Sequence, residues 1–232
     1  MKPRIAALLT VFNRKEKTLA CLSSLEKNIR DNFILDVFLT NDGCTDGTDD
    51  MVKELFPWVH VVDGDGNLYW NRGMYKAWCE AEKGDYDYYL WVNDDMLIYE
   101  NAIELLIKTS KDKNDRSIIV GYTTNSDKNK ITYGGRTHFS RLLDQINGVT
   151  ECSTFNGNFV LIPKLVYSVI GKNDPIFHHA IGDSDYGLRA EKAGIKCFIA
   201  KDACGICNTH EKLPKCFDPS VPFLTRCRYL YK

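Results

Sequence analysis

The sequence has neither a long hydrophobic run nor a surplus of charge of one sign. No stretch approaches the about 18 apolar residues typical of a membrane-spanning helix, and the apolar part of residues 1–17 is too short for a signal peptide. Lysine and arginine number 30 against 31 acidic residues, so no basic surplus exists to neutralise nucleic-acid phosphates. We therefore expect a cytoplasmic protein that does not bind nucleic acid.

A complete set of paired cysteines is also missing. The nine cysteines are odd in number and are scattered through segments typical of strands and helices, which favours reduced thiols over a disulfide framework. Cys204 and Cys207 have CxxC spacing, but no second pair of that spacing exists to complete a zinc site. We expect this pair to be incidental.

Two common ligand-binding patterns fail, one at a single position and the other at two. A GxGxxG pattern that starts at Gly64 has Tyr69 where its third glycine should stand, which argues against a dinucleotide-dependent oxidoreductase. A calcium loop that starts at Asp63 would need glycine in place of Leu68 and glutamate in place of Met74. Neither class of binding site fits the spacing.

The sequence does contain a regular alternation of strand-like and helix-like segments. Apolar runs predict strands at 5–10, 33–40, 58–62, 88–92, 117–121, within 154–163 and at 196–200. Helices are expected after residue 14, through residue 55, from about residue 71, at 101–108 and from about residue 183 to 194, with loops at 123–130 and 137–151. This order predicts an α/β fold with a mostly parallel central sheet and helices on both faces.

The segment from Tyr88 to Ile98 places acids directly after a strand. Residues 88–92 are aromatic or aliphatic on both faces, as in a buried central strand, and Asn93, Asp94 and Asp95 follow at once. Open α/β folds bind ligands at this end of their strands, and two adjacent acids favour Mg²⁺ or Mn²⁺ between them. The alternative is a solvated turn that caps the next helix.

A second group of acids opens a predicted helix near residue 183. Asp183 at the helix start is either an N-cap, worth about 1 kcal/mol, or a general base held ionised by the helix end. Asp185 is the rival base, but it lies about 200° around the helix from Asp183. Asp185 is also four residues before Arg189, so we expect those two side chains to pair.

Six segments, in this order, resemble the inverting glycosyltransferases of family 2, which have the GT-A fold. They are TVFNR (10–14), TNDGCTDGT (40–48), NLYWNRGMYKA (67–77), VNDDM (92–96), NGNFVLIP (156–163) and GDSDYGLRAEKAG (182–194). The last segment resembles bacterial galactofuranosyl- and rhamnosyl-type transferases most. The resemblance implies a single GT-A domain over 1–232, with a nucleotide-sugar-binding half at 1–95, an acceptor and catalytic half at 96–212, and a tail at 213–232.

The resemblance also implies roles for individual residues. Nucleotide-sugar contacts are expected from Thr10, Phe12, Arg14, Asp42, Asn67, Asn71, Gly73, Asn93 and Asp94, with Asp42 recognising the base. Asp95 and His210 are implied as ligands of Mn²⁺ or Mg²⁺, and Asp183 is implied as the general base. Asn93 stands where the family's DxD motif has its first aspartate. Asparagine keeps a side-chain oxygen but lacks the charge, which lowers the expected metal affinity.

The implied reaction moves a sugar from a nucleoside-diphosphate donor to a hydroxyl group, with inversion at the anomeric carbon. UDP or dTDP is the expected nucleotide, and a saccharide or lipid-linked glycan of cell-surface polysaccharide synthesis is the expected acceptor. Two alternatives remain open. One is a homologue that binds sugar nucleotide without transfer; the other is a nucleotidyltransferase, although TVFNRKEK lacks the glycine-rich loop of that class.

Aromatic residues near the expected site and at the end of the chain admit two interpretations each. Trp70 is a candidate platform for the acceptor sugar, whereas Trp91 is expected in the core. In the last 20 residues, basic and aromatic residues are interleaved. That pattern is compatible with contact to an anionic membrane, such as the inner face of the plasma membrane, and equally with a helix packed on the domain.

Overall fold

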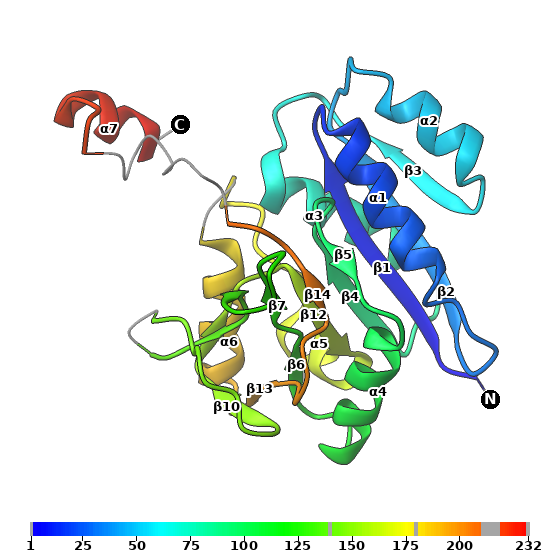
Figure 1. Ribbon diagram of the computed structural model, residues 1–232, viewed down its shortest axis with the longest axis vertical. Helices are drawn as coiled ribbons and strands as arrows, with labels where there is room; N and C mark the ends of the chain where they lie inside the picture. Colours follow the sequence, from blue (N-terminus) through cyan, green and yellow to red (C-terminus); the bar gives the residue numbers. More distant parts are fainter. Residues whose placement is uncertain (1, 139–140, 179–180, 210–218, 231–232) are drawn as a thin grey trace.

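A computed structural model describes residues 2–138, 141–178, 181–209 and 219–230. An eight-stranded sheet forms the centre of the molecule (Figure 1). Its strands, in spatial order, are β10 (Thr150–Cys152), β13 (Cys197–Ile199), β6 (Ile118–Val120), β12 (Phe159–Pro163), β4 (Tyr88–Val92), β1 (Arg4–Val11), β2 (Ile34–Asn41) and β3 (Val59–Asp63). The sheet therefore combines strands from both halves of the chain.

The prediction of a mostly parallel sheet is confirmed. In the sheet as described, β1 pairs in parallel with β2 and β4, β2 with β3, and β6 with β13. Strand β12 runs antiparallel between β4 and β6, and β10 runs antiparallel to β13 at the edge. Because β1 to β4 are parallel, the loops that follow them meet at one edge of the sheet.

Helices cover both faces of this sheet, as predicted (Figure 1). They are α1 (Lys15–Glu26), α2 (Thr48–Leu55) and α4 (Ala102–Asp112) on one face, and α3 (Tyr69–Ala81), α5 (Lys164–Ile170) and α6 (Gly182–Lys192) on the other. Strand β4 alternates between the two cores: Tyr88, Leu90 and Val92 face the first, and Tyr89 and Trp91 face the second. Trp91 is fully buried, so its predicted place in the core is confirmed.

Several predicted boundaries were wrong. Helix α3 begins at Tyr69 rather than near Asn71, because the carboxylate of Asp42, directly after β2, accepts hydrogen bonds from the amides at its start. Helix α5 was not predicted, although Pro163 directly before it is a common helix-start signal. The segment 123–130, expected as a loop, begins with a two-residue strand, β7 (Thr123–Thr124). The segment 137–151, also expected as a loop, ends in β10. Short strands of this kind depend on distant pairing partners, which local patterns do not reveal.

A small second sheet lies next to the acids that follow β4. It contains β5 (Leu97–Ile98), β14 (Gly205–Ile206), β7 and β8 (Ile131–Tyr133) in that order, and a separate pair joins β9 (Gly135–Arg136) to β11 (Thr154–Phe155). Gly205 pairs with Ile98 and Ile206 with Leu97. This pairing brings the residue after β14, Cys207, close to the acids before β5.

The end of the described chain is helix α7 (Phe223–Leu230), which lies apart from both sheets and their helices in Figure 1. Phe223 and Leu224 on it are 68% and 77% exposed. No helix in the described ranges is long and apolar enough to cross a membrane.

Candidate active site

The loops after β1, β2 and β4 enclose a cavity of about 280 Å³ at the carboxyl edge of the sheet. It is lined by Thr10, Val11, Phe12, Arg14, Asp42, Tyr69, Trp70, Asn93, Asp94 and Asp95. Seven of these residues were predicted to contact a nucleotide sugar or its metal. Phe12 and Tyr69 are exposed aromatic side chains on the cavity wall, at 53% and 55%.

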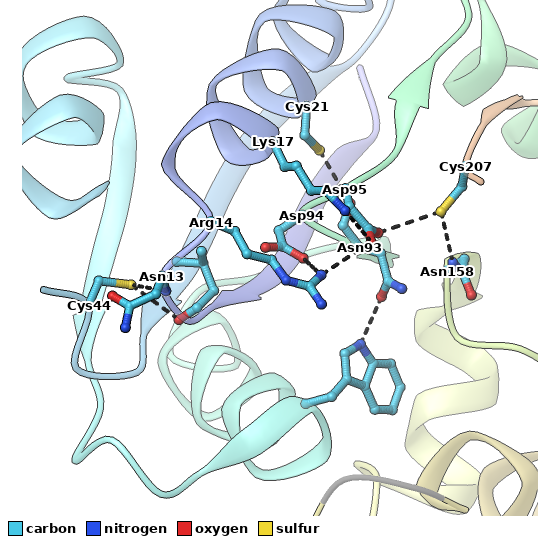
Figure 2. A network of polar contacts seen from close by, with 12 residues as sticks. Asn13, Arg14, Lys17, Cys21, Cys44, Asn93, Asp94, Asp95, Asn158 and Cys207 are labelled. Atoms are coloured by element: carbon cyan, nitrogen blue, oxygen red, sulfur yellow. Dashed lines mark hydrogen bonds and ion pairs between the residues drawn. The ribbon is translucent and has the colours of Figure 1, made fainter. Parts of the chain in front are cut away.

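Three charged side chains that line the cavity, Arg14, Asp94 and Asp95, contact one another, and we call them its floor (Figure 2). The Nη1 atom of Arg14 lies 3.1 Å from Asp94 Oδ1 and 3.2 Å from Asp95 Oδ2. Asp95 also has Lys17 Nζ at 3.9 Å and accepts a hydrogen bond from Cys207 Sγ at 3.5 Å. Both carboxylates therefore meet one guanidinium group.

The charge on Asp94 is only partly compensated. Its side chain is 9% exposed, and its Oδ2 atom is buried without a hydrogen-bond partner among the described residues. Burial, with a further contribution from Asp95, raises the pKa of Asp94 to about 6 despite the opposing charge of Arg14. A buried carboxylate oxygen without a partner costs free energy, and a bound cation would remove that cost.

The residues present fit a divalent metal. Asp94 and Asp95 supply adjacent oxygen donors, and Mg²⁺ or Mn²⁺ is commonly held by one or two carboxylates together with substrate phosphates. Within the described ranges, no group of three or more His, Cys, Asp or Glu side chains is arranged to hold a metal alone. His210, the other predicted ligand, lies outside the described residues.

We expect Asp94→Asn to stabilise the metal-free protein at pH 7 by roughly 1 to 3 kcal/mol, because the substitution removes a buried charge. The pKa of Asp94 is higher in the folded state than its ordinary value of 3.8, so its ionisation opposes folding. The contribution of Asp94 to the free energy of unfolding of the wild type therefore falls as the pH rises from 3.8 to about 6. Above that range it is constant. Thermal unfolding with EDTA should therefore show no difference between the proteins near pH 4 and the full difference above pH 6. A difference that does not change with pH would contradict this origin.

Asp42 holds the loop that leads into helix α3. Its Oδ1 accepts a hydrogen bond from Gly66 N at 2.8 Å, and its Oδ2 accepts from Leu68 N and Tyr69 N at 3.0 Å each. The residue is 3% exposed. Recognition of a nucleotide base stays a prediction for Asp42, and the structure adds that this carboxylate fixes the cavity wall and the helix start.

Three predicted contact residues do not line the cavity. Asn71 is fully buried: its Nδ2 donates to the carbonyls of Asp174 and Phe177, and its Oδ1 accepts from Asn173 Nδ2. Gly73 packs so tightly on β1 that an added Cβ would lie 2.1 Å from Thr10 Oγ1. Asn67 is exposed in the loop before α3. Packing therefore needs Asn71 and Gly73 where they are, and the ligand contacts of these residues stay a prediction.

Trp70 links the acid cluster to Asp183. Its Nε1 donates to Asn93 Oδ1 at 2.8 Å, so the oxygen that asparagine keeps at this position is already engaged. Its ring lies over Gly157, where an added Cβ would come within 2.5 Å of the indole. Gly157 N in turn donates to Asp183 Oδ2 at 3.0 Å. The two acid groups, almost ninety residues apart, are thus linked through Trp70 and Gly157.

Asp183 sits in the first turn of α6, held by backbone amides. Besides Gly157 N, Ser184 N donates to its Oδ1 at 2.8 Å. Burial raises the pKa of Asp183, and these hydrogen bonds and the charge of Arg136 oppose the rise. Asp185 behaves as predicted, because Arg189 Nε donates to its Oδ2 at 2.8 Å. That ion pair leaves Asp183 as the better base candidate.

Sequence reasoning missed several residues around this cavity. Cys207 of the CxxC pair contacts Asp95 and also accepts from Asn158 Nδ2 at 3.6 Å, whereas Cys204 is buried in the core. Lys17 could have been found, because it lies one helical turn after Arg14. Arg136 carried no local signal, since the β9–β11 pairing alone brings it to Asn156, whose Oδ1 accepts from its Nε at 3.0 Å.

The sequence and the fold were compared with those of known proteins. A structure to which the chain is similar is the mannosyltransferase PcManGT from Pyrobaculum calidifontis in complex with GDP-Man and Mn²⁺, with a TM-score of 0.67 and 13% sequence identity. The likeness covers 91% of this chain and 59% of the other, so this chain spans about three fifths of that protein's length. At this identity the likeness speaks for the fold. No curated protein matched the sequence.

The sequence also matches the model of the family described as "Glycosyl transferase family 2" over residues 7–169, well over half of the chain. That range contains the cavity loops after β1, β2 and β4. With the mixed sheet and its structural neighbour, the match confirms the predicted GT-A fold. The protein belongs to glycosyl transferase family 2.

Proposed function

We propose that this protein is a metal-dependent glycosyltransferase that moves a sugar from a nucleoside diphosphate to a hydroxyl group, with inversion. The observation that carries the proposal is the cavity itself. Two paired carboxylates line it, and a further carboxylate, Asp183, is held by the amide of Gly157, which packs against Trp70 of the cavity wall. Family membership and the structural neighbour, which was solved with GDP-Man and Mn²⁺, support this function.

Donor binding is assigned to the exposed wall and the floor of the cavity. Phe12 and Tyr69 offer flat surfaces on which a nucleotide base can stack. Asp94 and Asp95, with His210, would hold Mn²⁺ or Mg²⁺, which when bound neutralises the departing diphosphate as a Lewis acid. Arg14, beside the acids, is placed to donate to phosphate oxygens. Following the sequence resemblance, we propose UDP or dTDP as the nucleotide.

Asp183 is assigned as the general base. It takes the proton of the acceptor hydroxyl while that oxygen forms a bond to the anomeric carbon, and the bond from this carbon to the diphosphate oxygen breaks with its electron pair. Attack from the side opposite the leaving group inverts the anomeric configuration. Trp70, which donates to Asn93 and packs against Gly157, the residue that donates to Asp183, is the proposed sugar platform.

The acceptor is proposed to be a saccharide or lipid-linked glycan of cell-surface polysaccharide synthesis. Exposed apolar side chains on α7, Phe223 and Leu224, together with Arg226, support peripheral membrane contact from the cytoplasmic side. Vesicle flotation with and without anionic lipid would test that contact.

A panel of UDP-, dTDP- and GDP-sugars, incubated with protein and Mn²⁺, tests the proposal. We expect one donor to be hydrolysed slowly and to raise the melting temperature, since a ligand at 100 times its dissociation constant stabilises by about 2.7 kcal/mol. EDTA should remove both effects. Stabilisation by donors without any turnover, even with acceptor extracts, would favour a homologue that binds sugar nucleotide without transfer. The missing charge at Asn93 is a reason to consider that alternative. No response to any donor would overturn the proposal.

A further inference from the structure

The position of Arg14 between the two carboxylates carries an inference beyond donor contact. One atom, Nη1, serves both Asp94 Oδ1 and Asp95 Oδ2, at 3.1 and 3.2 Å (Figure 2). The two aspartate side chains are only 9% and 5% exposed, whereas that of Arg14 is 37% exposed. Two buried negative charges thus depend mainly on one cationic group that approaches from the solvent side.

The backbone of Arg14 is fixed independently of its side chain. Arg14 precedes helix α1, and its carbonyl accepts a hydrogen bond from Thr18 N at 2.9 Å. The preceding Asn13 adopts a left-handed conformation with φ of 50°, and its Oδ1 accepts from Thr45 N at 2.7 Å. The side chain can therefore turn about its own bonds without disturbing the helix or the loop.

A guanidinium group and a divalent cation compete for the negative charge of these two carboxylates. A metal bound to Asp94 and Asp95 would meet a like charge at close range, and such repulsion is strong where water is largely excluded. Arg14 must then leave the pair, and it already lines the cavity in which a donor's phosphates would lie. Phosphate oxygens are preferred partners of guanidinium groups.

We propose that Arg14 is an exchangeable counter-ion: it holds the Asp94–Asp95 pair when no metal is bound and moves to the donor diphosphate when a divalent cation takes the pair. One side chain then opposes metal binding by the free protein and favours it when nucleotide is present. The cavity accordingly binds the metal–nucleotide complex better than either component alone. This inference rests on the proposed metal site at Asp94 and Asp95.

Titration of Mn²⁺ followed by electron paramagnetic resonance tests the proposal without measuring turnover. With no nucleotide, Arg14→Gln should bind Mn²⁺ about tenfold more tightly than wild type, because the competing cation is gone. With Mn²⁺ saturating, Arg14→Gln should bind UDP or dTDP, whichever the wild type prefers, about tenfold more weakly, because a charge-assisted contact to phosphate is lost. Arg14→Lys, which keeps the charge, should lie between the two proteins in both measurements.

Arg116→Gln is the matched control. Arg116 is exposed just before β6, a strand that runs parallel to β4, so it stands at the opposite edge of the sheet from the cavity. Its removal should change neither affinity. Thermal unfolding of each variant with excess Mn²⁺ verifies that the binding measurements refer to folded protein.

The possible outcomes separate this inference from the proposed function. If Mn²⁺ binds wild type and Asp95→Asn equally, the metal site of the proposed function is wrong. If Mn²⁺ binding depends on Asp95 but Arg14→Gln binds Mn²⁺ no more tightly than wild type, the exchange role of Arg14 is wrong while the metal site stands. Tighter Mn²⁺ binding together with unchanged nucleotide affinity would overturn the second half of the exchange.

Discussion

Asp183→Asn should lower kcat by about 10² to 10⁴-fold, the usual contribution of a general base. The amide keeps an oxygen that can accept from Gly157 N or Ser184 N, so the start of α6 should stay folded. Because Asp183 does not line the donor cavity, the affinity for nucleoside diphosphate should be unchanged. The measurement is initial-rate kinetics with a donor identified by the panel, alongside a binding titration of the same protein.

Asp185→Asn is the matched control for this substitution. It removes the same charge two residues later, and Asp185 is paired with Arg189 on the helix. Loss of a partly exposed i,i+4 ion pair should reduce stability by only about 0.5 kcal/mol and leave kcat near wild type. If Asp185→Asn loses kcat while Asp183→Asn keeps it, the rival base is the correct one.

The pH profile gives a second readout for Asp183. Burial raises the pKa of this carboxyl group, and a general base works only when it is ionised. Wild-type kcat/KM should therefore fall as the pH decreases through that raised pKa, at a higher pH than for an ordinary carboxyl group. In Asp183→Asn this acidic limb should disappear from the residual activity. Its persistence would assign the limb to another group.

Asp95→Asn should weaken Mn²⁺ binding by roughly 10²-fold or more, since even residues that only support metal ligands contribute 10- to 100-fold. The substitution removes the charge that Arg14 and Lys17 approach and that Cys207 contacts. Donor affinity measured with Mn²⁺ should fall to the level that wild type shows in EDTA. Isothermal titration of nucleoside diphosphate, with and without Mn²⁺, provides the measurement.

Asp65→Asn serves as the control for charge at this edge of the sheet. Asp65 is exposed, accepts a hydrogen bond from Asn67 N, and does not line the cavity. Its variant should bind Mn²⁺ and nucleotide like wild type. Equal losses in both variants would mean that general surface charge, and not Asp95, governs the affinity.

The floor of the candidate site was predictable because it depends on local sequence. Tyr88 to Val92 are apolar on both faces, which marks a central strand, and Asn93 to Asp95 follow it directly. Parallel pairing of β1, β2 and β4 then places the residues after each strand at one edge. The pairing of Asp185 with Arg189 was equally predictable, since helical spacing alone decides it.

The supporting contacts of the site were not predictable, since each depends on an approach between distant segments. Asn71 belongs to a matching motif, yet its amide is used by a loop about a hundred residues later. Cys207 reaches Asp95 only because β14 pairs with β5. Local patterns do not report such contacts, because short strands and loops take their structure from their partners.

The sequence by itself determined the family, the alternation of strands and helices, and the presence of carboxylates at the ends of β4 and the start of α6. Only the tertiary structure decided what those groups touch. Hydrophobic periodicity fixes where a strand or helix lies, but the charge on a carboxylate is governed by burial and by neighbours brought from elsewhere in the chain. For that reason Arg14, far from the acids in sequence, proved to be their principal counter-ion in the fold.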